Sequence, residues 1–238
     1  MPEAGGRAAL ALRILGILGL AVFLAVTHLC NSPVRAEDRP GVPSVQTLAP
    51  SPPRDLDTFL DRMSALPGFC SDFEEEKTLS LLDAPLRSRG RIVFAQPNRL
   101  LRRVTEPLES DVVLDGDSVE IRTGSQIQQI DLSTQPGLEP LVRSVLWILA
   151  GDREAIARTY HATFESRESG WSLRLTPRDP RLATLISEMR LEGVGGLPTR
   201  LVLVETTGDR TQTRFIDPEI GCPLSEVDRA RFFAPTPR

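Results

Sequence analysis

The fold of this chain is decided by residues 69–119, FCSDFEEEKTLSLLDAPLRSRGRIVFAQPNRLLRRVTEPLESDVVLDGDSV. Short runs of Val, Ile, Leu and Phe alternate there with turn residues, a pattern typical of strands of about four to eight residues. Asp115-Gly116-Asp117 favours a tight hairpin between two such runs. The stretch therefore predicts strands that pair antiparallel in chain order, and it carries no set of residues typical of a catalytic site.

The same pattern continues toward the C-terminus. The expected strands are Phe69–Leu79, Ser88–Ala95, Arg99–Thr105, Ser110–Leu114, Ser118–Arg122, Ile127–Leu132, Tyr160–Ser166, Trp171–Thr176, Ile186–Glu192, Arg200–Thr206 and Thr211–Ile216. An antiparallel sheet of about eleven strands must curl, and its concave face then needs a cover or a ligand. We therefore expect a mainly β (α+β) fold built on one strongly curved antiparallel sheet.

Helical periodicity interrupts the strands in a few places, and these helices are the expected cover. Asp55 can cap a short amphipathic helix that Pro67-Gly68 ends. Apolar residues recur at helical spacing over Leu138–Ala150, and Asp152–Arg158 predicts a further short helix.

The N-terminal residues have the features of a secretion signal. Arg7 and Arg13 form a basic region, the apolar run Ile14–Val26 is too short to span a bilayer, and small residues allow cleavage after Ala36. The alternative is an uncleaved anchor. We assign residues 1–36 to a signal peptide.

Two further regions follow the signal. Residues 37–53 are rich in proline and small side chains, which is typical of a flexible linker. Residues 54–238 have the size of one domain.

The cysteine inventory after residue 36 consists of Cys70 and Cys222. In an oxidising compartment they can form a disulfide, worth about 4 kcal/mol in the chain-entropy model. Two separate buried thiols are an equally good interpretation. The sequence leaves both open.

Several function classes lack the residues they need. His161 is the single histidine beyond residue 36, so a zinc site, a Cys-His pair or a Ser-His-Asp triad cannot be assembled in the usual way. The net charge of −4 gives no electrostatic basis for nucleic-acid binding. We interpret the acidic run Glu74-Glu75-Glu76 as a solvated strand end and not as a carboxylate pair for acid–base catalysis. A non-enzymatic protein without a cofactor is expected.

Several motifs occur in an order that matches a known family. They are Phe69 and Phe73 as Phe-x-x-x-Phe, the segment Gly90–Asn98, Thr105 with Pro107, Asp115-Gly116, Leu175-Thr176-Pro177, and Phe232 with Pro235. In this order the chain resembles the periplasmic outer-membrane lipoprotein carrier family, LolA, and more closely its divergent relatives. The resemblance covers the whole domain.

The resemblance implies an incomplete (half) β-barrel, covered by short helices, that shields acyl chains from water in the periplasm. Such a sheath is needed because each buried methylene is worth about 0.8 kcal/mol. It implies a monomeric carrier that receives a lipoprotein or lipid cargo from an inner-membrane exporter or lipid transporter and delivers it to an outer-membrane acceptor, without nucleic acid or catalysis. The alternative is a non-catalytic module that senses or binds lipid or lipoprotein and regulates an envelope partner.

The cavity wall that the resemblance implies is assigned to Phe69, Phe73, Phe94, Leu100, Arg102, Leu146 and Trp147. Leu138–Ala150 is the candidate lid, although an ordinary core-packing helix would have the same pattern.

Two positions depart from the family pattern. Gln96 replaces the arginine that contacts the lid, so a guanidinium clamp is absent there. Arg102 replaces a tryptophan, and alternation places it on one face with Leu100 and Val104. We hypothesise that Arg102 meets an anionic lipid head group in the cavity; a bulge that turns it to solvent is the alternative.

Overall fold

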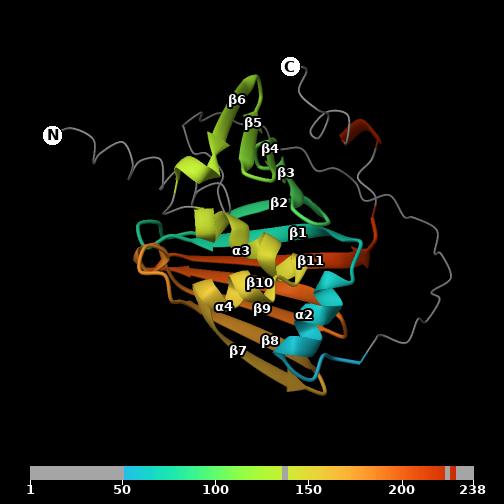
Figure 1. The fold of residues 1–238 in the computed structure, drawn as a ribbon. Coiled ribbons are helices and arrows are strands. Elements are labelled where there is room, and N and C mark those ends of the chain that lie inside the picture. Colours follow the sequence, from blue (N-terminus) through green and yellow to red (C-terminus); the bar gives the residue numbers. More distant parts are fainter. Residues whose placement is uncertain (1–50, 136–138, 223–225, 229–238) are drawn as a thin grey trace.

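A computed structural model describes residues 51–135, 139–222 and 226–228 (Figure 1). These residues form an eleven-stranded sheet. Its strands are β1 (Gly68–Thr78), β2 (Leu86–Ala95), β3 (Arg99–Glu106), β4 (Ser110–Asp115), β5 (Ser118–Thr123), β6 (Gln126–Asp131), β7 (Tyr160–Arg167), β8 (Gly170–Pro177), β9 (Ile186–Val194), β10 (Leu197–Glu205) and β11 (Arg210–Ile220). Every strand expected from the sequence is confirmed.

The strand order shows how the sheet is assembled. It runs β6-β5-β4-β3-β2-β1-β11-β10-β9-β8-β7, so two antiparallel meanders meet where the first strand pairs with the last. Phe73 of β1 lies opposite Phe215 of β11 in this central pair. Strands β6 and β7 are the free edges, and the barrel is therefore incomplete, as expected.

The turn at Asp115-Gly116-Asp117 forms the predicted hairpin between β4 and β5. Gly116 adopts a positive φ of 60°, a conformation that costs a residue with a Cβ about 1–2 kcal/mol.

Three helices lie over one face of the sheet (Figure 1): α2 (Leu56–Ser64), α3 (Glu139–Ala150) and α4 (Arg153–Thr159). Asp55 caps α2, its side chain accepting a hydrogen bond from the Thr58 backbone N–H at 2.7 Å. Asp152 caps α4 in the same way. Two short 3₁₀ helices lie at Leu132–Thr134 and Leu182–Thr184.

The few differences from expectation concern element ends and the chain termini. Leu132 was expected to end a strand but begins a 3₁₀ helix, because the Asp131 side chain caps the turn by accepting from the Ser133 N–H. The predicted signal peptide, residues 37–50 of the linker, Leu138, Phe232 and Pro235 lie outside the described residues. No helix within the described ranges is long and apolar enough to cross a membrane.

The main hydrophobic core lies between the concave face of the sheet and the helices. Strand β1 illustrates how it forms, since Phe69, Ser71 and Phe73 are buried on this face while Asp72 and Glu74 are exposed on the other. The three helices add buried side chains that include Phe59, Leu60, Leu141, Leu146 and Ile156. A second, small cluster of Leu101 and Val113 lies on the opposite face of β3 and β4.

Candidate ligand cavity beneath helix α3

A cavity of about 60 Å³ lies between α3 and the concave face of the sheet. Its wall is apolar apart from three side chains of the sheet, Glu75, Arg102 and Thr213. Helix α3 contributes Val142, Val145 and Leu146. A smaller cavity of about 20 Å³ shares Val145 and continues toward Phe69. Together they form an apolar space that α3 closes.

The predicted wall residues divide into two groups. Phe73, Leu100, Arg102 and Leu146 line the larger cavity, and Phe69 lines the smaller one. Phe94 is fully buried in the core and Trp147 is half-buried against it, but neither lines a cavity in this closed arrangement. The role of all seven as ligand contacts stays a prediction.

Arg102 points into the larger cavity. Its neighbours in register are Ile92 of β2 and Val112 of β4, with no bulge at this position, so the alternative in which Arg102 turns to solvent is wrong. Its side chain is only 7% exposed, and Nη2 donates a hydrogen bond to Glu75 Oε1 at 2.9 Å. The guanidinium carbon lies 4.5 Å from the centre of the Phe73 ring, within reach of a cation–π contact.

Glu75 corrects the interpretation of the acidic run. Glu74 and Glu76 are exposed as expected, but Glu75 is 5% exposed and faces the cavity. Besides Arg102, its oxygens accept hydrogen bonds from Thr213 Oγ1 at 2.8 Å and Ser88 Oγ at 3.4 Å. Glu75 is two positions after Phe73 on the same strand and therefore shares its face, and this spacing could have placed Glu75 at the cavity.

A second buried ion pair lies nearer the end of the same strand. The Lys77 ammonium group is 2.8 Å from a Glu205 carboxylate oxygen, and both side chains are almost fully buried. Lys77 is the single lysine of the chain. The sequence analysis did not identify either residue, because their strands β1 and β10 are far apart in sequence and not adjacent in the sheet.

Helix α3 is attached to both halves of the sheet by polar contacts near its start. Ser144 and Tyr160 of β7 share a hydrogen bond, and Ser144 Oγ also bonds the Pro140 carbonyl oxygen. Burial raises the pKa of Tyr160 to about 12, although the hydrogen bond with Ser144 opposes this shift. Arg143 forms ion pairs with Glu139, at 3.1 Å, and with Asp117 in the β4–β5 turn. Burial lowers the pKa of Arg143.

Gln96 contacts α2. Its side-chain amide donates to the Met63 carbonyl oxygen at 3.4 Å. Helix α3 is the lid expected from the sequence, so Gln96 contacts a different covering helix. A function of Gln96 in lid closure stays a prediction.

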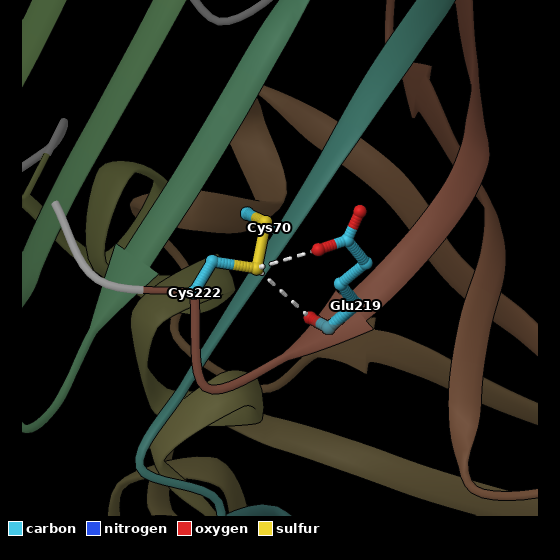
Figure 2. Close-up of side chains that lie close together, drawn as sticks. All are labelled: Cys70, Glu219 and Cys222. Carbon is cyan, nitrogen blue, oxygen red and sulfur yellow. Dashed lines mark hydrogen bonds between the residues drawn. A yellow bond between two sulfur atoms is a disulfide. The ribbon is translucent and has the colours of Figure 1, made fainter. Parts of the chain in front are cut away.

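Cys70 and Cys222 form a disulfide, with their Cα atoms 5.9 Å apart (Figure 2). The backbone and carboxylate oxygens of Glu219 lie 3.6 and 3.8 Å from Cys222 Sγ. A bridged sulfur has no proton to donate, so only the reduced thiol could form these as hydrogen bonds. The bond joins the start of β1 to the segment after β11, at the centre of the sheet.

The same three residues are the one group of potential metal ligands among the described parts of the chain. A metal-binding cysteine must be a free thiolate, and both sulfurs here are bonded to each other. The arrangement therefore does not suit a metal ion.

A larger hollow of about 600 Å³ is open to solvent and lined by charged side chains. Its arginines are already paired, since Arg87 contacts Glu76, Arg89 contacts Glu106 and Arg214 contacts Glu74. Exposed ion pairs of this kind contribute little to the stability of the fold. The smaller apolar cavity is therefore the better candidate site.

An open antiparallel sheet with helices over an apolar concave face defines the class of half-barrel binding proteins. Residues 48–214 match a family model described as outer membrane lipoprotein carrier protein LolA-like. The chain belongs to this LolA-like family, which confirms the resemblance seen in the sequence. The family is associated with lipid or lipoprotein binding and carrier roles. No curated protein sequence matches the chain significantly.

Solved structures to which the chain is similar include a LolA superfamily protein from Nitrosomonas europaea, with 13% identity, a TM-score of 0.41, and coverage of 72% of this chain and 96% of the other. MucB of Pseudomonas aeruginosa, in its complex with MucA, has 19% identity and a TM-score of 0.44, covering 73% of this chain and 59% of the other. LprF from Mycobacterium bovis has 12% identity and a TM-score of 0.35, covering 74% and 97%.

Proposed function

We propose that the protein is a periplasmic carrier that holds the acyl chains of a lipoprotein or lipid between the sheet and its covering helices. In this role it takes cargo from the inner membrane and delivers it toward the outer membrane, without catalysing a reaction. The observation that carries this proposal is the apolar cavity closed by α3 on the concave face of an open sheet. Family membership supports the same role.

The size of the cavity indicates how the carrier would work. Sites that enclose a small ligand have volumes of about 300–1,000 Å³, whereas the larger cavity here has about 60 Å³. A cavity of about 60 Å³ is too small to enclose an acyl chain. Acyl chains would enter by displacing α3, whose residues Val142, Val145 and Leu146 occupy the concave face. The apolar wall left by α3 would then contact the chains, at about 25 cal/mol per Å² of apolar surface removed from water.

The disulfide supports the periplasm as the compartment. Disulfides persist in oxidising environments such as the bacterial periplasm, and Cys70 and Cys222 are bonded. The N-terminal features of a secretion signal support the same location.

Tryptophan fluorescence provides a direct test of cargo binding. Trp147 lies half-buried on α3, so displacement of the helix should shift its emission. Trp171 serves as the internal reference, because it is 4% exposed, contacts the Phe59 ring, stacks on Phe164, and donates to the Gly195 carbonyl oxygen. Titration with monopalmitoylglycerol should change the emission of the natural chain but not that of Trp147→Phe. An unchanged spectrum, with no lipid in the natively purified protein, would contradict the proposal.

Transfer between membranes separates a carrier from a sensing module. Donor vesicles loaded with a labelled acylated peptide and label-free acceptor vesicles would be mixed with the protein. A carrier moves label to the acceptor at a rate that increases with protein concentration. Binding without transfer would support the sensing or binding module instead.

A further inference from the structure

Arg102 and Glu75 form the charged side of the larger cavity. In the described part of the chain, most hydrogen-bond acceptor sites of Glu75 have a partner, whereas most donors of Arg102 do not. The two carboxylate oxygens of Glu75 accept three hydrogen bonds, from Arg102, Thr213 and Ser88. Arg102 has five N–H donors. Within the described residues it makes one hydrogen bond, to Glu75, and a contact with the face of Phe73.

The remaining donors of Arg102 lie in a place where hydrogen bonds matter. The Arg102 side chain is only 7% exposed, and it lines the cavity beneath α3. Buried donors are nearly always paired in folded proteins, and water competes poorly in an apolar space. The cavity therefore presents hydrogen-bond donors to whatever occupies it but few unused acceptors, because Glu75 already accepts three of the roughly four hydrogen bonds that a carboxylate can take.

Charge decides which acceptor fits. Glu75 already neutralises Arg102 at 2.9 Å, so the pair brings no net charge into the cavity. An anionic group would add an unbalanced negative charge close to Glu75 in apolar surroundings, which is unfavourable. A neutral oxygen acceptor adds no charge and can still accept from the guanidinium group.

We propose that Arg102 binds the carbonyl oxygen of the ester or amide bond at the root of an acyl chain. This inference rests on the proposed acyl-chain binding and names the part of the cargo that is recognised. The chain itself would extend along the apolar wall formed by α3 and the neighbouring strands. The cargo class is thus a neutral acylated group, in contrast to the anionic head group expected from the sequence.

Three probes with the same sixteen-carbon chain length test this assignment in the natural protein: 1-monopalmitoylglycerol, its ether analogue 1-O-hexadecylglycerol, and palmitate. Each is titrated while Trp147 emission is recorded at neutral pH. We expect the ester to bind about tenfold more tightly than the ether, since a hydrogen bond to a charged group is lost. Palmitate should bind no more tightly than the ester. Equal affinity for ester and ether, or preference for palmitate, would overturn the assignment.

Two variants test the residues themselves. Glu75→Gln/Arg102→Met removes both charges together and so avoids leaving one buried charge unpaired. It should lose the preference for ester over ether while keeping the ether affinity within about twofold, and a retained preference would contradict a role of Arg102. Glu75→Gln alone leaves Arg102 with an uncompensated positive charge. It should bind palmitate about tenfold more tightly relative to the ester than the natural protein does.

The outcomes distinguish this inference from the proposed function. Binding of all three probes with equal affinity supports acyl-chain binding and rejects recognition by Arg102. Failure of all three to bind rejects acyl-chain binding, and the assignment with it. Circular dichroism and a thermal unfolding curve establish that each variant is folded before titration.

Discussion

Tyr160 and Ser144 share a buried hydrogen bond that attaches the covering helix α3 to the edge strand β7. Because Ser144 Oγ also donates to the Pro140 carbonyl oxygen, the hydroxyl proton of Tyr160 is the one available for the bond between them. The bond must break if α3 moves away from β7. In the proposed carrier it would therefore contribute to the barrier against displacement of α3.

Replacing Tyr160 with phenylalanine should loosen α3. Tyr160→Phe keeps the ring but removes the hydroxyl, which we expect to cost about 1 kcal/mol of stability and to accelerate ligand uptake. Stopped-flow measurement of Trp147 emission would report the rate. Ser144→Ala removes the same bond from the other side, so the two substitutions together should cost less than their sum. An uptake rate unaffected by either substitution would show that the bond does not restrain the helix.

The raised pKa of Tyr160 predicts a loss of stability at alkaline pH. The pKa of Tyr160 is raised from 10.0 to about 12 in the folded state, chiefly by burial. Below pH 10 the hydroxyl is protonated in both states and adds no pH dependence. Between pH 10 and about 12 the unfolded chain releases the proton first, so the free energy of unfolding should fall by about 1.4 kcal/mol per pH unit from this group. Urea unfolding of the natural chain and Tyr160→Phe across this range should give a steeper slope for the natural chain, and parallel slopes would refute the contribution.

Reduction of the disulfide should destabilise the fold substantially. Cys70 and Cys222 are 152 residues apart in sequence, and a loop of this length corresponds to about 5 kcal/mol in the chain-entropy model. Dithiothreitol should lower the melting temperature of the natural chain to that of Cys70→Ala/Cys222→Ala. The double variant itself should not respond to dithiothreitol, which controls for any other cysteine. If reduction leaves the melting temperature of the natural chain unchanged, the bond makes no net contribution.

The buried pair of Lys77 and Glu205 predicts a strong asymmetry between single and double substitution. Lys77→Met leaves the Glu205 carboxylate buried without a counter-charge and should cost about 3–5 kcal/mol. Lys77→Met/Glu205→Leu removes both charges and should recover most of that loss. Chemical denaturation measures both values. Arg87→Met is the matched control, because the pair of Arg87 with Glu76 is exposed and should contribute less than about 1 kcal/mol.

Filling the cavity should compete with the cargo. Val145 lines both cavities, and Val145→Phe places a larger apolar group in the space between α3 and the sheet. Stability should change by less than about 3 kcal/mol, while the affinity for monopalmitoylglycerol should fall at least about tenfold. Val194→Phe adds the same volume at an exposed site and should not change the affinity. Normal ligand binding by a folded Val145→Phe would place the ligand elsewhere.

Much of this fold could be predicted from local sequence. Alternation within each strand and the turn at Asp115-Gly116-Asp117 defined the meander, and helical spacing after residue 138 defined the cover. The pairing of β1 with β11 could not be obtained in this way, because alternation shows which face a residue occupies but not which distant strand lies beside it. The choice between a disulfide and two thiols depended on that same pairing, which brings Cys70 close to Cys222.

The candidate site was predicted only in part, because alternation shows which face a residue occupies but not which residues of other strands lie beside it. Alternation placed Arg102 on one face with Leu100 and Val104, and the family resemblance assigned Phe73 and Arg102 to the cavity wall. Both side chains line the larger cavity. Glu75 was misinterpreted because its neighbours Glu74 and Glu76 are solvated, and because its partner Arg102 reaches it across the intervening strand β2. Burial of a charge depends on such a partner, which no local pattern reveals.

The two free edges of the sheet, β6 and β7, are consecutive in the chain, and residues 132–159 connect them. This connection contains α3 and α4, so the cover is covalently continuous with both edges of the opening it covers. A helix attached to the sheet at one end could rotate away from it. Helix α3 is connected to both edge strands, so it cannot move away from the sheet without displacing them. In the proposed carrier, accommodating a bulky cargo would therefore be coupled to the circumference of the half-barrel, and the stiffness of the sheet would limit the size of that cargo.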